Sequence, residues 1–302
     1  MLWVFSGVFY GFFMSLYTFI NQKYKINGYI LGMWRGFGVT IISLPVFFLI
    51  PFELNGAFYG LLALQGILTG LYDSSLFTAT AKYGTRPTSK MLVFSVPLSL
   101  VLTWIIRKGS FSELWNRPIA FFMVILAVLG FMICYYKMLK KSVSRELVLS
   151  IFPAVIAWSV MSSLTYEIMN YDNIAVGLIY YLTISMFVSG LYNLCLYVGT
   201  QKKTMTWINI KKRAFSERVM TVGLLLILFS TVLIVAKGIA LAFAPNTAYV
   251  TMLSLTFPLW VMFFNYWVKS KEESSFQWGM GVLFFLFLMI GFTLFKKKYI
   301  VL

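Results

Sequence analysis

The chain has 302 residues, of which 60% are hydrophobic and only 11% are charged. Soluble domains carry about 25% charged residues, so this composition excludes an ordinary water-soluble protein and indicates an integral membrane protein. The chain has 2 Cys, both inside apolar runs, and no His, which argues against disulfides and against Cys/His metal sites. The net charge of +16 lies between apolar runs rather than in one patch, which favours attraction to anionic lipid headgroups over nucleic-acid binding.

Apolar runs bounded by charges, Pro or Asn follow one another along the whole chain. Each is about 20 residues long, the length that a helix needs to cross a hydrocarbon layer of about 30 Å. In lipid, a single segment can satisfy its backbone hydrogen bonds only as a helix. The first run lacks a basic start and a cleavage site, so we expect a retained helix rather than a signal peptide. We predict about ten transmembrane helices, at 2–21, 28–50, 58–81, 88–106, 119–136, 148–170, 174–197, 219–243, 247–268 and 276–295.

The connections carry most of the charge. The longest, from Thr200 to Arg218, contains the basic string 211–213 and is expected to be a loop or a surface helix. Most of the 25 Lys and Arg residues fall in the loops after odd-numbered runs. Basic residues are retained on the cytoplasmic side, so this count predicts that both termini face away from the cytoplasm.

The two halves of the chain are alike. A shift of 161 positions places ATAKYGTRPTSKMLVFSVPLSL, from Ala79, on ALAFAPNTAYVTMLSLTFPLWV, from Ala240. In both stretches one helix ends, the chain turns, and a second helix begins with a Pro about ten residues in. Five helices per repeat is an odd number, so the second copy must be inverted, an arrangement that recurs in transporters. The identical pairs are Ala79 with Ala240, Ala81 with Ala242, Met91 with Met252, Leu92 with Leu253, Pro97 with Pro258, and Leu98 with Leu259.

These residues resemble the EamA-like branch of the drug/metabolite transporter superfamily. After the stretches just quoted, the first half continues with RKGSFSELW and Gly130, and the second with KSKEESSFQW and the glycines 279, 281 and 291. Arg35 in ILGMWRGFG also resembles an Arg found early in the family's second helix. The match spans nearly the whole chain, although 108–110 reads Lys-Gly-Ser where the family often has Gly-Glu.

The resemblance implies an all-α membrane protein of about ten helices, with inverted five-helix repeats at 1–141 and 142–302. It implies a secondary transporter that moves a small metabolite by alternating access, in a bacterial inner membrane, with a proton or ion as an optional coupling partner and with a homodimer left open. The family keeps both termini cytoplasmic, contrary to the loop charges, so the orientation stays open.

Four ionisable residues lie within the apolar runs: Arg35, Asp73, Glu167 and Lys237. Each costs roughly 2.5 to 3.5 kcal/mol at the centre of a membrane, so each should face a partner or a watery cavity. One interpretation places Asp73, Glu167 and Lys237 on a central cavity, where they bind substrate or relay a proton. The other makes the charged residues structural pairs. The resemblance places Arg35 away from the cavity.

Further candidates surround these charges. Tyr72 and Ser74 flank Asp73 and either contact the substrate or bond to a neighbouring helix. Lys90 either closes a gate or meets headgroups, and we favour headgroups. Thr247 and Thr251 follow the matching turn of the second half. The prolines 97 and 258 each free a carbonyl one turn earlier, which predicts paired bends that act as hinges or as fixed kinks.

The charges of these four ionisable residues sum to zero, which favours an amino acid or a similar zwitterion as the substrate. No Walker sequence GxxxxGK[ST] occurs, so we expect an ion or substrate gradient, and no cofactor, to drive transport. A receptor or assembly partner with the same fold is the alternative. An enzyme is the least favoured, because Tyr72-Asp73 supplies only one motif of the intramembrane aspartyl proteases.

Overall fold

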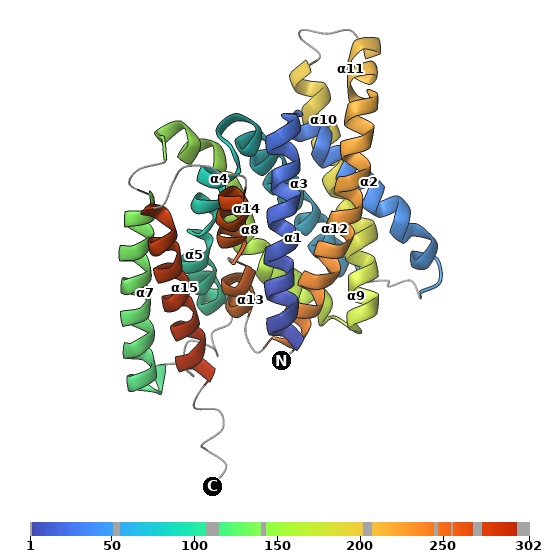
Figure 1. Cartoon of the computed structure of the whole chain (residues 1–302). Helices are drawn as coiled ribbons and strands as arrows, with labels where there is room; N and C mark the ends of the chain where they lie inside the picture. Colours follow the sequence, from blue (N-terminus) through green and yellow to red (C-terminus); the bar gives the residue numbers. More distant parts are fainter. Residues whose placement is uncertain are drawn as a thin grey trace.

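The computed structural model describes residues 2–50, 55–106, 115–139, 143–201, 207–244, 247–254, 256–267 and 274–294. Helices make up almost all of this part of the chain, which contains no strand (Figure 1). The helices are α1 Leu2–Tyr24, α2 Gly28–Phe47, α3 Gly56–Tyr83, α4 Thr85–Leu92, α5 Ser95–Ile106, α7 Pro118–Leu139, α8 Arg145–Met169, α9 Ile174–Tyr180, the π-helix η1 Tyr181–Ser185, α10 Met186–Gln201, α11 Trp207–Ala214, α12 Glu217–Phe243, α13 Thr247–Ser254, α14 Phe257–Trp267 and α15 Ser274–Leu294.

The chain has the helices of a multi-pass membrane protein. Six segments in the described residues are long and apolar enough to cross a bilayer, and they coincide with six predicted runs. They are α1, α2, α7, α8, the continuous segment Ile174–Gln201, and α12. The helix α3 has 28 residues but is not among them, since Gln65, Thr69 and Asp73 interrupt its apolar sequence.

Polar side chains set where several of these helices begin. The side chains of Asn27, Asn55 and Asn173 each accept a hydrogen bond from the backbone N–H two residues later, and Ser144 accepts one from Leu147. Such caps satisfy backbone donors that have no partner inside a helix. The Asn clusters that bounded the predicted runs therefore fix the first turns of α2, α3 and α9, and Ser144 does the same for α8.

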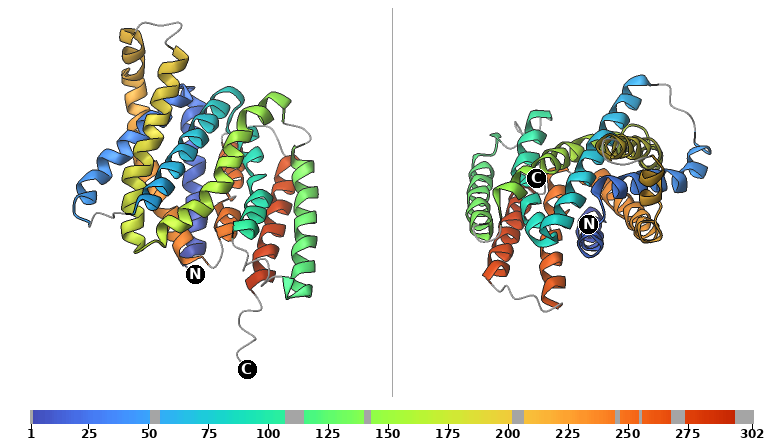
Figure 2. Two further views of the ribbon diagram at one scale, coloured as in Figure 1. Left: turned by 180° about the vertical axis from the view of Figure 1, so that it is seen from behind. Right: turned by 90° about the horizontal axis from the view of Figure 1, so that it is seen from above.

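The helices pack in pairs that join distant parts of the sequence. The closest pairs are α3 with α8, α1 with α12, α2 with α10, and α7 with α15. The pair α7 and α15 forms one side of the molecule, and α1 begins at the end of the molecule where α15 finishes (Figures 1 and 2). In Figure 2, α8 descends toward the end from which α1 rises.

Two of the predicted runs are interrupted helices. The run 88–106 divides into α4 and α5, and the run 247–268 divides into α13 and α14. At the first junction, N–H groups of Val93, Phe94 and Val96 donate to carbonyls only three residues earlier, so the chain tightens there. Pro97 and Pro258 lie in the first turn of α5 and α14, where a missing N–H has no cost. The break thus precedes each proline.

Candidate functional site

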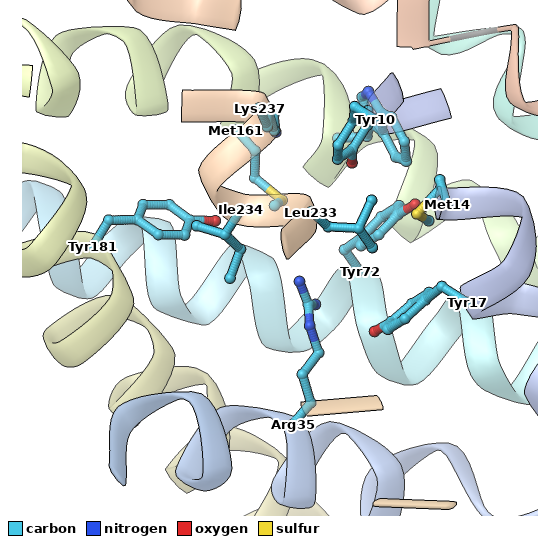
Figure 3. A pocket seen from close by; sticks show the side chains of 11 residues that line it. Tyr10, Met14, Tyr17, Arg35, Tyr72, Met161, Tyr181, Leu233, Ile234 and Lys237 are labelled. Carbon is cyan, nitrogen blue, oxygen red and sulfur yellow. The ribbon is translucent and has the colours of Figure 1, made fainter. Parts of the chain in front are cut away.

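A cavity lies inside the bundle, between helices from the first and second halves of the chain. Its lining comes from α1, α2, α3, α8, η1 and α12 (Figure 3). It has room for a water molecule or two rather than for a metabolite. The lining residues are Tyr10, Met14, Tyr17, Arg35, Tyr72, Trp158, Met161, Tyr181, Leu233, Ile234 and Lys237.

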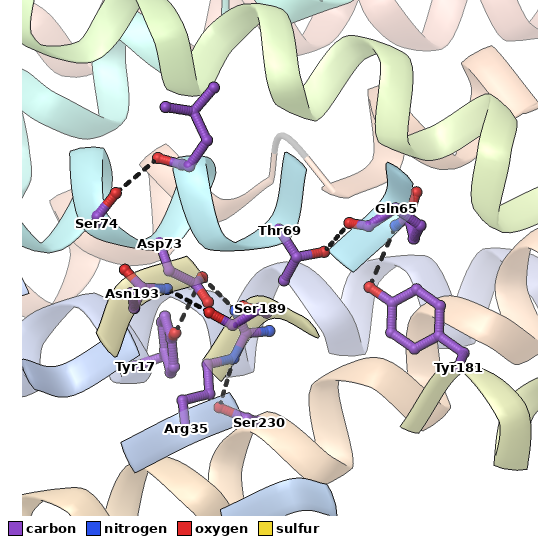
Figure 4. A network of polar contacts seen from close by, with 11 residues as sticks. Tyr17, Arg35, Gln65, Thr69, Asp73, Ser74, Tyr181, Ser189, Asn193 and Ser230 are labelled. Carbon is purple, nitrogen blue, oxygen red and sulfur yellow. Dashed lines mark hydrogen bonds and ion pairs between the residues drawn. The ribbon is translucent and has the colours of Figure 1, made fainter. Parts of the chain in front are cut away.

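Arg35 and Asp73 form an ion pair at the base of this cavity. The Nη1 of Arg35 contacts Oδ1 of Asp73, which also accepts a hydrogen bond of 3.4 Å from the hydroxyl of Tyr17. The Nε of Arg35 donates to Ser230 Oγ at 3.0 Å (Figure 4). A buried charge is stable when it is both paired and hydrogen-bonded, and these contacts supply both conditions for Arg35.

The structure places Arg35 and Asp73 differently from what the sequence predicted. Arg35 lines the cavity, so the expectation that its helix lies away from the cavity is wrong. Asp73 is fully buried and lies directly behind the wall, bound to two lining residues, rather than on the cavity surface. Its second oxygen, Oδ2, has no hydrogen-bond partner among the described residues.

A line of polar residues on α3 continues from Asp73. Gln65, Thr69 and Asp73 are spaced by four and therefore share one face of the helix. The amide of Gln65 donates to Thr165 at 3.0 Å. It also donates to the hydroxyl of Tyr181 at 3.3 Å (Figure 4). Tyr181 begins the π-helix, and such irregular turns are frequent at functional sites.

Lys237 is the second cation on the cavity surface. The residue is 9% exposed, and its Nζ lies 5.9 Å from the centre of the Trp158 ring. Arg35 points toward the middle of the cavity from α2, and Lys237 lies on the opposite side, as Figure 3 shows. Within the described part of the chain, no ion pair involves Lys237. The charged groups that line the cavity are therefore both cationic.

Two other predicted candidates lie elsewhere. Glu167 is exposed in the last turn of α8, so the expectation that it faces the cavity is wrong, and the balance of charges that favoured a zwitterion fails with it. Lys90 is 2% exposed, and its Nζ lies 3.5 Å from the carbonyl oxygen of Met138. Contact of Lys90 with headgroups is therefore also wrong.

The remaining candidates join helices or lie at their ends. The hydroxyl of Ser74 donates to the Leu71 carbonyl in its own helix at 3.1 Å, and Tyr72 lines the cavity with its ring edge-on to Trp158. Thr251 donates to Ser162 at 3.1 Å and so ties α13 to α8. The side chain of Thr247 lies outside the described residues.

The sequence did not predict most of the aromatic residues that line the cavity. Tyr10, Met14 and Tyr17 recur at the spacing of one helix face, a signal that could have indicated a shared surface on α1. Trp158 and Tyr181 gave no such signal, because aromatic residues are common in every run of this chain. Their place depends on how α8 and η1 pack against α3.

Comparison with known proteins adds no relative to this picture. A scan against protein-family models found no match, and a search of curated proteins found none either. The resemblance to the drug/metabolite transporters therefore rests on the residues of the chain itself.

Proposed function

We propose that this protein is a secondary transporter that carries a small metabolite by alternating access between two inverted five-helix repeats, in a bacterial inner membrane. The observation that carries the proposal is the cavity between the halves, whose surface holds Arg35 and Lys237. Charged groups within a membrane protein are costly and mark substrate or ion pathways. In transporters of inverted repeats, the substrate site lies between the copies.

Helix positions support the repeat. Counting α4 with α5, α13 with α14, and α9 with η1 and α10 as single spans, and leaving out the short basic helix α11, gives ten spans in the described part of the chain. Shifted by 161 residues, α3, α4 and α5 fall on α12, α13 and α14, with bounds that differ by at most one residue. Both interrupted helices thus occupy matching places.

Helix pairing supports the same relation. In the proposed repeat, α1 corresponds to α8, α3 to α12, α2 to α10 and α7 to α15. Exchanging the halves therefore converts the packed pair α3–α8 into the packed pair α12–α1, and it converts the pairs α2–α10 and α7–α15 into themselves. This is the pattern expected of a pseudo-twofold axis that relates the two halves.

The first test is thermal stabilisation of the detergent-purified protein by a panel of amino acids and metabolites. A ligand at 100 times its Kd adds about 2.7 kcal/mol to the free energy of unfolding, so a substrate should raise the melting temperature. We expect a hit that Lys237→Met strongly weakens and that vesicles containing the protein take up.

Glu167→Gln is the matched control, because it removes a charge from the same bundle outside the cavity. It should keep the hit. If no compound stabilises the protein while Lys237→Met unfolds at a lower temperature, Lys237 is a structural residue and a non-transporting receptor becomes the better account.

A further inference from the structure

The chemical character of the cavity indicates which class of substrate it accepts. Arg35 and Lys237 bring two formal positive charges to its surface, and no carboxylate is among the described lining residues. Asp73 lies behind the wall and is already paired with Arg35. The surface therefore lacks a negative charge opposite Lys237.

The hydrogen-bonding groups show the same imbalance. Two lining residues, Tyr72 and Trp158, carry buried polar atoms without a partner in the described structure, the hydroxyl of Tyr72 and Nε1 of Trp158. The indole N–H can only donate, and a phenol donates readily. Lys237 adds three more N–H donors. A ligand that satisfies this surface must supply acceptors.

We propose, building on the transport function above, that the substrate is a small organic carboxylate without an ammonium group, and that its carboxylate binds between Arg35 and Lys237. A carboxylate offers acceptors only and one negative charge, which matches the surplus of donors and cations. The faces of the tyrosines 10, 17 and 72 and of Trp158 would contact the apolar part of the molecule. An ammonium group would meet no free carboxylate on the described surface.

The test compares matched ligands by their effect on the melting temperature of the purified protein. One set is 3-phenylpropionate, its amide and L-phenylalanine, and the other is butanoate, its amide and 2-aminobutanoate. Each set keeps the carbon skeleton and changes only the charged group. We expect an acid to stabilise the protein, and its amide and its amino acid to do so at concentrations about 30-fold higher or not at all.

A pair of cavity variants tests the site itself. Leu233 lines the cavity one turn before Lys237 on α12, so Leu233→Glu places a carboxylate at the favourable spacing of four. The carboxylate of this glutamate should compete with the ligand, so that a carboxylic acid no longer stabilises the protein. Glutamine has nearly the same size as glutamate but no charge, so Leu233→Gln should retain the stabilisation. Lys237→Met should weaken the binding of the acid by about 30-fold, and Lys237→Arg should preserve this binding.

The outcomes separate this inference from the proposed function. If amides or amino acids stabilise the protein as well as the acids do, or if other panel compounds bind while no acid does, the carboxylate assignment is wrong and transport stands. If no compound binds and the cavity is reachable from one side of the membrane only, transport itself is wrong. Equal loss of binding in Leu233→Glu and Leu233→Gln would also overturn the placement of the carboxylate.

Discussion

Asp73 and Arg35 stabilise each other at the centre of the bundle, where their side chains are almost fully buried. The charge of each compensates the loss of water around the other, and Tyr17 and Ser230 complete the hydrogen bonds. Removing one partner of a buried pair leaves an unpaired charge, which typically costs about 3 to 5 kcal/mol.

We therefore predict that Arg35→Met and Asp73→Leu each lower the melting temperature strongly, and that the double variant is more stable than the worse single variant. The reason is that the double variant leaves no unpaired charge behind. Thermal unfolding of the four proteins in detergent, as a double-mutant cycle, measures the coupling. Additive losses would show that the two side chains act independently.

At this scale the sequence identified charges but not their neighbours. Asp73 and Lys237 stood out because ionisable residues are rare in apolar runs. Glu167 stood out for the same reason, yet it lies in the last turn of α8 and is exposed, so it avoids the cost of burial. A shift of a few residues in a predicted helix end decides whether a charged residue lies in the middle of a helix or at its end. Helix ends are the part of a sequence-based prediction that is least accurate.

At the scale of helices, α2 and α10 approach each other through glycines. A Cβ built at Gly36 would lie 2.5 Å from the Cα of Gly190, a distance that no side chain tolerates. Small residues at such crossings let two backbones pack closely in a membrane, where dispersion and hydrogen bonds drive association. These glycines therefore set the spacing between the helices that carry Arg35 and η1.

Gly36→Ala should lower the melting temperature, since the added methyl group pushes α2 away from α10. Gly199→Ala is the matched control in α10, because no atom of a neighbouring element among the described residues lies within 4 Å of the place that its methyl group would take. Helix propensity favours Ala over Gly by about 1 kcal/mol at both sites, so the control should be neutral or slightly stabilised. Equal effects of the two substitutions would contradict the close packing.

The interrupted helices provide a second prediction at this scale. Pro97→Ala and Pro258→Ala each restore an N–H that can donate to the carbonyl four residues earlier and so extend α5 or α14 across the break. If these breaks act as hinges, the double variant should transport more slowly while its melting temperature stays equal or rises. Transport at the wild-type rate would make them fixed kinks.

The sequence predicted these interruptions only in part. Proline indicated a bend in each run, and both runs are indeed divided. The breaks come before the prolines rather than at them, because proline fits the first turn of a new helix and hydrogen bonds of the shorter 3₁₀ type close the preceding turn.

At the scale of the whole molecule, the apolar periodicity predicted a multi-pass helical protein, and six helices of spanning length and composition among the described residues confirm that class. The internal repeat remains a prediction, supported by matching helix bounds and exchanged helix pairs. The cavity could not be predicted from the sequence, since it forms where side chains of six elements from both halves meet. No local sequence pattern indicates which side chains meet there.

The most direct test of the central claim needs no knowledge of the substrate. Cys134 and Cys195 are replaced by Ala, and Ile234, on the cavity wall, is replaced by Cys. Alternating access predicts that a membrane-impermeant thiol reagent labels Ile234→Cys from either side, in right-side-out and in inverted vesicles, since the cavity opens to each side in turn. Labelling from one side alone, or from neither, would contradict the transport account.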